Sequence, residues 1–309
     1  MTYLFVTLIF LFIVFVAAGL FVVQYAMTRR DRTELFKSST VAPSGRLKFK
    51  NSVEQGVFWF EAQPFKTVTL RSHDGLNLSG LLLSPPKPKA CMVALHGFRS
   101  WPSREFAGVS KLLFDNNIAV LYPYQRSHRL SEGRYITFGV KEKYDCAKWC
   151  EFLSGEYPEL PLFLYGQSMG GATVLMTGAV KMPEQLKGVI ADSAYDCPAD
   201  IIMDLFRRSY HLPAYPLIWF VDLWTLILCR YGVFKNKASR SMRAGLSYLF
   251  IHGDADELVP FHMGKTNFEK CPSQRKTFLT IEGAGHCACC YQQKEEYDSA
   301  LLNFINDNL

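Results

Sequence analysis

The stretch LFLYGQSMGGATVL, residues 162–175, sets Ser168 between two glycines, with an apolar run before it and another after it. The residues before Gly166 are typical of a buried strand, and those after Gly170 are typical of a helix. Where a strand turns directly into a helix the backbone is strained, so the residues two before and two after the serine must lack a Cβ. Ser168 would then stand at a helix N-terminus, which favours developing negative charge. The G-x-S-x-G pattern in this context predicts a serine nucleophile, and a purely structural tight turn is the alternative.

Strand and helix patterns alternate on both sides of this turn. Strands are predicted over residues 65–71, 76–83, 91–95, 118–122, 162–165, 188–191, 248–252 and 278–281, and helices over 105–116, 140–153 and 169–180. The Asp74-Gly75 pair predicts a tight turn and an antiparallel hairpin between the first two strands. The remaining alternation predicts an α/β fold with a mostly parallel central sheet covered by helices on both faces.

Two later strands end in loops that carry further reactive groups. The strand 248–252 is followed by GDADELVP, which contains Asp256, and the strand 278–281 is followed by EGAGH, which ends in His286. The carboxyl ends of parallel strands meet at one edge of a sheet, so both side chains can approach Ser168 there. A nucleophilic serine needs a base and a group that orients the base, and these two residues supply both.

The N-terminal segment has a different character. No charged residue stands between Thr2 and Met27, and residues 3–23 are nearly all apolar. A helix of that length crosses a hydrocarbon core of roughly 30 Å. A cleaved secretory signal is the alternative, but a signal should begin with a basic segment and carry a shorter apolar run. The sequence therefore predicts an uncleaved, single-pass membrane anchor over residues 1–28.

Charges and cysteines indicate which side of the membrane the rest of the chain occupies. The first charges after the apolar run are Arg29, Arg30, Arg32 and Lys37. By the positive-inside rule they keep the following domain in the cytoplasm. The nine cysteines are an odd number without the spacing of a secreted disulfide scaffold, which favours reduced thiols. We expect a polar connector over residues 29–60 and one folded domain over 61–309.

Composition argues against several classes of partner. The chain has 49% hydrophobic residues and a net charge of +6, and its lysines and arginines are scattered, so we expect no nucleic-acid partner. Cys287, Cys289 and Cys290 crowd around His286, which could suggest a metal cluster. The spacing lacks a second ligand pair at the distance of a zinc site, so we expect no metal and no cofactor.

Four motifs together resemble the α/β-hydrolase superfamily in order and spacing. They are HGF (96–98), GQSMGG (166–171), HGDADELVP (252–260) and GAGH (283–286). Within the superfamily the chain is similar to single-span, membrane-anchored bacterial hydrolases grouped with serine aminopeptidase-like and esterase-like proteins. That closer similarity is carried by SEGRYITFG (131–139), YDCAKWCEFL (144–153) and YHLPAYP (210–216).

The resemblance implies a role for each matching residue. Ser168 is the implied nucleophile, His286 the general base and later acid, and Asp256 the group that orients the imidazole. The implied oxyanion hole consists of the backbone N–H groups of Phe98 and Met169.

Some alternatives to these roles come from neighbouring residues. Asp254 is two residues from Asp256, and Asp192 follows a strand where some superfamily members carry the acid; Asp256 fits the family spacing best. Three histidines beside glycines or at turns are expected to be structural, namely His73, His96 and His252. Arg126 and His128 match a loop region of the family. Most members have an acid and a glycine at the positions of Tyr124 and Arg129, so we interpret the loop in this chain as scaffold.

The chain between the strand at 188–191 and the strand at 248–252 is longer than one crossover helix needs. We expect a helical cap over about 194–245. Residues 212–229 are strongly apolar, but Pro213, Pro216 and Asp222 interrupt them, so a cap helix is favoured over a second membrane span. An apolar cap near a membrane favours a lipophilic acyl substrate, and simple packing of its aromatics on the core is the alternative.

The sequence therefore predicts a serine hydrolase that cleaves carboxylic esters of small molecules through an acyl-enzyme intermediate. A peptidase or amidase, a thioesterase and an acyltransferase would use the same three groups and remain alternatives. A non-catalytic binding protein of the same fold is an alternative of another class, because fold alone does not imply function.

Overall fold

The computed structural model describes residues 1–29, 44–208, 211 and 213–309. Some positions used above lie outside these ranges and are not interpreted further. They are Arg30, Arg32 and Lys37 with the rest of residues 30–43 of the connector, and Tyr210 and Leu212 of the 210–216 motif.

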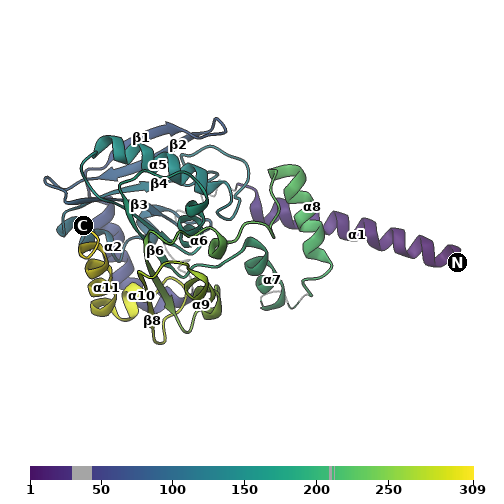
Figure 1. Ribbon diagram of the computed structural model, residues 1–309. Helices are drawn as coiled ribbons and strands as arrows, with labels where there is room; N and C mark the ends of the chain where they lie inside the picture. The colour runs from purple at the N-terminus through teal and green to yellow at the C-terminus, as the bar shows by residue number, and fades with distance from the viewer. Residues whose placement is uncertain (30–43, 209–210, 212) are drawn as a thin grey trace.

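An eight-stranded sheet forms the centre of the molecule, with the order β1-β2-β4-β3-β5-β6-β7-β8 (Figure 1). The strands are β1 (Lys66–Arg71), β2 (Asn77–Leu83), β3 (Ala90–Leu95), β4 (Ile118–Pro123), β5 (Leu162–Gln167), β6 (Leu186–Asp192), β7 (Ser247–Gly253) and β8 (Lys276–Ile281). β1 pairs antiparallel with β2, and β2 with β4, whereas every later pair is parallel. The predicted mostly parallel sheet with one hairpin is confirmed.

Every residue of β3, β4, β5 and β7 is buried, which explains why these strands are nearly continuous apolar runs. The hairpin turns where predicted: Gly75 has φ +90°, and the amide of Ser72 donates to the carbonyl of Leu76 at 2.8 Å. Helices on both faces bury the central strands, while β1 and β2 extend the sheet at one edge.

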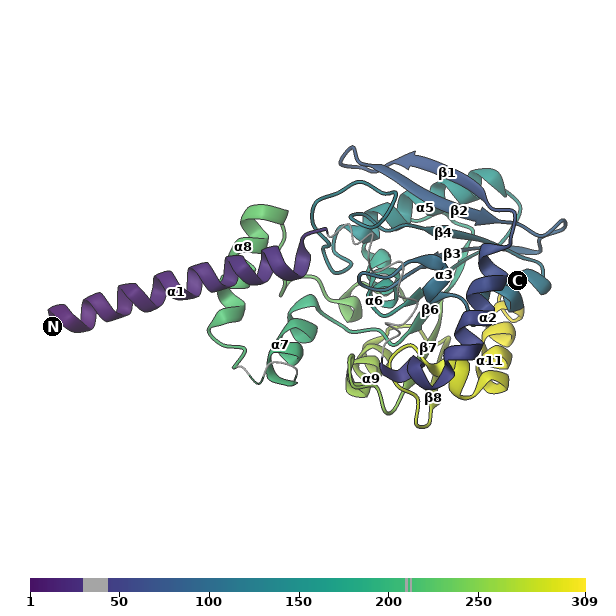
Figure 2. The same cartoon turned by 180° about the vertical axis from the view of Figure 1, so that it is seen from behind.

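Two layers of helices cover the sheet (Figure 2). One layer contains α5 (Glu142–Glu156), α6 (Met169–Met176) and α9 (Phe261–Lys270); the other contains α2 (Lys50–Glu61), α4 (Ser110–Asp115), α10 (Cys289–Gln292) and α11 (Lys294–Asn306). The remaining elements are α1 (Thr2–Met27), α3 (Pro102–Glu105), α7 (Pro198–Arg208), α8 (Leu217–Cys229) and the 3-10 turns η1 (Ser44–Phe49), η2 (Thr177–Ala179) and η3 (Ala238–Arg240).

Two predicted segments differ from the structure. The helix expected over 105–116 is shorter in the structure: α3 ends at Glu105 and α4 begins at Ser110, and between them Gly108 lies against Cys290 and Tyr291 of the C-terminal layer. The stretch expected as a polar connector contains η1 and α2, and Phe60 of α2 is 2% exposed in the core. Local sequence pattern missed this helix because only one of its residues is buried.

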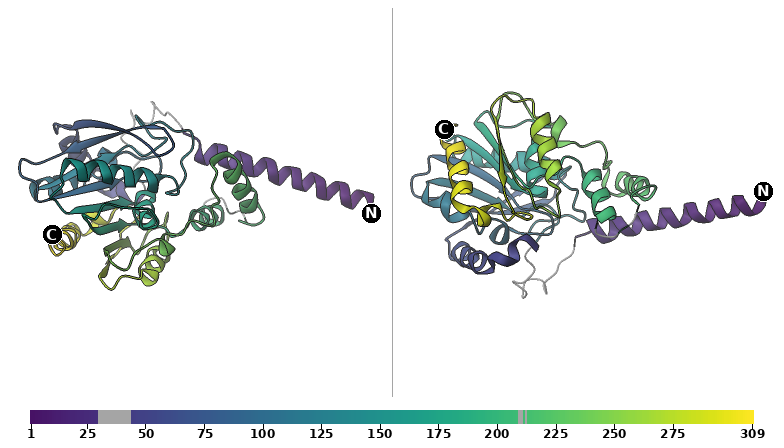
Figure 3. Two further views of the ribbon diagram at one scale, coloured as in Figure 1. Left: turned by 45° about the horizontal axis from the view of Figure 1, so that its top comes forward. Right: turned by 90° about the horizontal axis from the view of Figure 1, so that it is seen from below.

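α1 projects from the body of the molecule, and α8 lies beside it (Figures 1 and 3). The ring of Phe220 on α8 packs against Phe12 and Phe15 of α1, with centroid separations of 5.6 and 5.8 Å. Near its C-terminal end α1 enters the domain, where Val23 and Met27 are fully buried in the core. In the described part of the chain, α1 is the one helix that is long and apolar enough to cross a membrane.

Candidate active site

Ser168 stands at the turn between β5 and α6 in a conformation that is rare for a residue with a side chain. Its φ and ψ are 56° and −119°, and its amide donates to the carbonyl of Asp192 at 2.9 Å. A Cβ at Gly166 would overlap the backbone of Gly170, and a Cβ at Gly170 would overlap the backbone of Leu95. The two glycines thus allow the strand and helix to close on each other, and the serine side chain is held clear of both.

The structure brings Ser168, His286 and Asp256 together, although they come from three separate loops. Ser168 Oγ lies 2.9 Å from His286 Nε2, and His286 Nδ1 lies 2.7 Å from Asp256 Oδ2. With the ring hydrogen on Nδ1, the imidazole donates to the carboxylate and accepts the serine hydroxyl. This arrangement lets His286 take a proton from Ser168 while Asp256 stabilises the resulting charge.

The electrostatics of the acid and the base are set by their mutual contact. Burial by itself raises the pKa of Asp256, but the charge of His286 and hydrogen bonds from His252 and His286 outweigh burial and hold this pKa well below its usual range. Burial lowers the pKa of His286, and the Asp256 carboxylate outweighs it and raises that pKa well above its ordinary value. The amides of Leu258 and Val259 donate to Asp256 Oδ1 at 2.9 and 2.8 Å, which fixes the carboxylate.

The two rival carboxylates have other partners. Asp254 Oδ1 accepts the amide of Gly283 at 2.7 Å. Asp192 is fully buried and accepts hydrogen bonds from Ser193, Gln167 and Tyr297. The structure therefore pairs His286 with Asp256 and leaves Asp192 to support the nucleophile turn.

The residues expected to form an oxyanion hole flank the serine. Phe98 and Met169 line the same cavity as Ser168. Within the described ranges, no backbone or side-chain acceptor takes the amide hydrogen of either residue. Both amides are thus available to a substrate oxygen beside Ser168 Oγ.

Arg46, which the sequence reasoning missed, connects the loops of the site. Its guanidinium is 1% exposed and donates to Glu105 Oε1 at 2.8 Å, Gln167 Oε1 at 2.9 Å and the carbonyl of Cys287 at 2.7 Å. Glu105 in turn accepts the amide of Gly97 at 3.2 Å. One side chain from η1 therefore connects the residues next to Ser168 and His286 with the loop that contains Gly97. Nothing in the spacing of the polar stretch marks this arginine.

A cavity of about 540 Å³ opens over Ser168. Most of its walls come from α1, from the loop after β3 at Phe98 and Arg99, and from the segment between β6 and β7, which includes Ile202 and Phe206 of α7; Phe138, Leu258 and Val259 complete them. Arg99 is the one charged residue among those that line it in the described part of the chain. The cavity is shaped for an apolar group next to the nucleophile.

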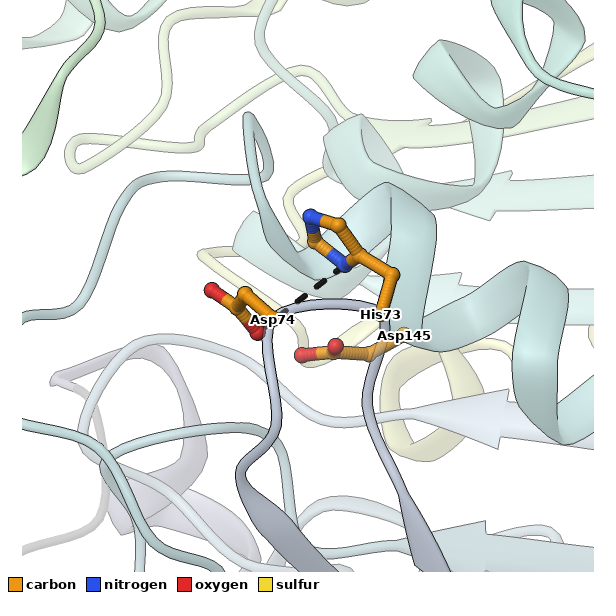
Figure 4. A group of neighbouring side chains, drawn as sticks. All are labelled: His73, Asp74 and Asp145. Atoms are coloured by element: carbon orange, nitrogen blue, oxygen red, sulfur yellow. Dashed lines mark ion pairs between the residues drawn. The ribbon is translucent and has the colours of Figure 1, made fainter.

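A second polar cluster lies under the loop that contains Arg126 and His128. Figure 4 shows His73, Asp74 and Asp145 with their ligand atoms facing one another, within 4.8 Å. Arg126 donates to both carboxylates, at 2.6 Å to Asp145 and 2.9 Å to Asp74. The Arg126 guanidinium supplies a positive charge to both carboxylates, and this partly exposed ion-pair network anchors the loop.

The other histidines and cysteines contact the backbone or the core. His96 Nε2 accepts the amide of Gln125 at 3.1 Å, and His128 Nε2 accepts the amide of Arg99 at 3.0 Å. Cys287, Cys289 and Cys290 are free and buried, and burial raises the pKa of the Cys290 thiol to about 12.

Comparisons with known proteins bear on this geometry. The family model described as serine aminopeptidase, S33, matches residues 86–207, which include Ser168 but end before Asp256 and His286. Rat monoglyceride lipase is 27% identical over 251 residues, or 71% of this chain and 82% of that protein. The yeast membrane protein YNL320W, from Saccharomyces cerevisiae, is 30% identical over 167 residues, or 54% of this chain and 53% of the relative.

Solved structures show the same fold at low sequence identity. The Pyrococcus furiosus esterase Pf2001 aligns with a TM-score of 0.65 at 22% identity and covers 80% of this chain and 92% of its own. At that identity the similarity establishes the architecture, and the chemistry has to be argued from the site itself.

Proposed function

Because this chain is a member of the α/β-hydrolase superfamily, we propose that it cleaves carboxylic esters with Ser168 as nucleophile, His286 as general base and Asp256 as orienting acid. The observation that carries the proposal is the continuous line of contacts from Ser168 Oγ through His286 to Asp256 at the edge of an apolar cavity. The serine-hydrolase class itself, esterase-like or lipase-like, is supported by the relatives.

The proposed reaction has two halves. Ser168 Oγ attacks the ester carbonyl carbon while its proton passes to His286 Nε2, and the carbonyl oxygen becomes an oxyanion bound by the amides of Phe98 and Met169. The alcohol then leaves with the proton from His286, and Ser168 keeps the acyl group. Water, deprotonated by His286, attacks the acyl-enzyme, and the acid leaves as Ser168 recovers its proton.

The lining of the cavity favours esters over peptides. A peptidase that binds a free amino terminus needs negative charge near the nucleophile, whereas the charged residue at this cavity is Arg99. The family model is described as a serine aminopeptidase, so an amidase using the same three groups is the second candidate.

We also propose that α1 anchors the protein and stays attached. Cleavage after residue 28 would remove Val23 and Met27, which are fully buried in the core, so a released domain would lose part of its own interior. The positive charges after α1 begin with Arg29 and favour a cytoplasmic domain. A reporter fused to the C-terminus checks this orientation: activity of a reporter that works only outside the cytoplasm would contradict it.

The catalytic proposal is tested with the full-length chain in detergent micelles and a series of p-nitrophenyl esters. We expect turnover in the parent protein, its loss in Ser168→Ala, and covalent labelling of Ser168 by a fluorophosphonate probe. Asp256→Asn should also lower turnover severely. Asp254→Asn is its matched control, because Asp254 lies two residues away and accepts the amide of Gly283. Turnover that survives Ser168→Ala would contradict the proposal, and turnover of aminoacyl amides but not esters would favour the amidase.

A further inference from the structure

α1 is fixed to the domain by its own backbone. The amide of Ile136 donates to the carbonyl of Met27 at 2.7 Å, and the amide of Arg29 donates to the carbonyl of Arg134 at 2.7 Å. The Arg99 guanidinium donates to the carbonyls of Tyr25 and Ala26, at 2.7 and 3.0 Å, in the last turn of the helix. A flexible tether would make none of these contacts. The C-terminal part of α1 therefore has a set position relative to Ser168.

This fixed part of α1 forms a wall of the cavity over Ser168. The helix contributes Ala18, Phe21, Val22, Tyr25, Ala26 and Met27 to the lining. Ala18, Val22 and Ala26 are four residues apart and share one face of the helix, and all three are half-buried. Small side chains on that face leave room beside the nucleophile, whereas the neighbouring Ala17 is exposed and does not line the cavity.

α8 extends the apolar surface of α1. Besides its ring contacts with α1, Phe220 lies against Gly19, and Trp224 Nε1 donates to the carbonyl of Val16 at 2.8 Å. α8 also carries exposed apolar side chains, with Trp219 59% and Ile227 56% exposed. α1 projects beyond α8 toward the N-terminus (Figure 3), and that part of the helix also carries exposed apolar residues.

A continuous apolar surface of this kind is stable in hydrocarbon and unstable in water. α1 is long enough to cross a bilayer, and α8 contacts it at residues 12–19, well inside the apolar run. α8 has only 13 residues, too few to span the roughly 30 Å of a hydrocarbon core, so it would lie within one leaflet beside α1. The hydrocarbon tails of the lipids in that leaflet are therefore the partner that fits the exposed apolar surface of α1 and α8.

We propose that α1 is a wall of the acyl-binding site as well as an anchor, and that the substrate is an ester of a membrane lipid whose acyl chain enters the cavity from the leaflet around α1 and α8. This proposal rests on the proposed ester hydrolysis for the chemistry at Ser168. The role of α1 in binding an acyl chain is tested separately from that chemistry.

The first experiment compares Ala18→Phe with Ala17→Phe in the full-length chain, reconstituted in phosphatidylcholine nanodiscs. Both variants add the same side chain to α1 at consecutive positions, but only Ala18 lines the cavity. We expect Ala18→Phe to lower the laurate-to-acetate ratio of kcat/KM for p-nitrophenyl esters by about tenfold, and Ala17→Phe to change it by less than about twofold. A ratio that is unchanged by Ala18→Phe, or lowered equally by both variants, would overturn the proposal.

The second experiment needs no turnover. Ser168→Ala protein in nanodiscs is irradiated with a monoacylglycerol that carries a diazirine at the end of its acyl chain, and the adducts are mapped by mass spectrometry. We expect adducts on Val22 and Ala26 that excess oleoylglycerol suppresses. Adducts confined to the exposed residues of α1 would overturn the proposal, and protein-to-protein links through Trp219 would assign the α8 surface to a second copy of the chain instead.

The two experiments separate the two proposals. Cavity adducts in a protein that hydrolyses no ester would leave α1 as an acyl-binding wall and refute ester hydrolysis. Ester turnover without cavity adducts, and with an unchanged chain-length profile, would support ester hydrolysis and refute the role of α1.

Discussion

The Ser168 turn and the Arg46 segment both support the same site, but by opposite means. The turn is local: a positive φ at the serine and two glycines within two residues set the direction of the side chain. Arg46 acts over long distances in the chain and contacts Cys287, which is 241 residues away. A strained turn requires particular residues at particular spacings, whereas a long-range contact requires only that one side chain reach its partners.

The strongest test of the local region is Ser168→Ala. We expect kcat for the best ester to fall on the order of 10⁶-fold, because the nucleophile is lost while the fold keeps its contacts. Steady-state rates and circular dichroism of the purified variant measure the two effects. Ser299→Ala, on the exposed face of α11, is the control and should retain full activity. A variant that loses its fold together with its activity would contradict the local description.

Asp256→Asn tests the contact between Asp256 and His286 through the pH dependence of kcat/KM. We expect kcat to fall on the order of 10⁴-fold, since the orienting carboxylate is lost. His286 must be neutral to accept a proton, and its pKa is raised above the ordinary 6.5. In the parent protein kcat/KM should therefore rise with pH through an inflection above 6.5, and in the variant this inflection should move to lower pH. An inflection that stays in place would show that Asp256 does not control His286.

Arg46→Ala tests the long-range region. Glu105 would keep a buried charge without its partner, which typically costs about 3 to 5 kcal/mol of unfolding free energy. If the arginine positions the three loops, kcat should also fall about tenfold or more with KM unchanged, and Arg46→Lys should recover part of it. Urea unfolding and steady-state kinetics measure both. Lys48 is an exposed neighbour in η1, and Lys48→Ala should change neither the unfolding free energy nor kcat. Equal effects of the two variants would show that Arg46 does not position the loops of the site.

Gly45→Ala should have the smallest effect of the four. A Cβ at Gly45 would lie 2.8 Å from the Cα of Gly285, next to His286, so the two loops must separate slightly. Overpacking of this kind costs about 1 to 3 kcal/mol. Gly155→Ala, in α5 where a Cβ meets nothing within 4 Å, should instead stabilise the helix. Thermal unfolding measures both changes: Tm should fall for Gly45→Ala and rise for Gly155→Ala.

The sequence predicted the architecture well because the central strands and the nucleophile turn carry local signals. Apolar runs identified the buried strands, and the glycines beside Ser168 identified the turn. Asp256 and His286 could be named because each follows a strand end, and their contact with Ser168 is a geometric result that the strand order makes possible. Their catalytic roles stay a prediction until the variants are measured.

The parts that the sequence did not predict depend on packing between distant segments. η1 and α2 read as a polar connector because Arg46 and Phe60 are isolated buried residues without periodicity. α1 was predicted from its apolar length, and that signal is the same whether the helix is surrounded only by lipid or also lines a cavity. Its contacts with Arg99 and Ile136 lie more than 70 residues away, where no local pattern can encode them.

The position of α1 in the core also imposes an order on folding. Met27 leaves the ribosome long before Tyr231, yet the hydroxyl of that tyrosine lies 3.8 Å from Met27 Sδ in the folded domain. The interior of the domain is therefore completed only after the chain through Tyr231 has been made, which under the proposed anchoring is after α1 has entered the membrane. Synthesis at the membrane would couple insertion of α1 to folding of the domain. A domain that folded without α1 would lack one wall of its cavity.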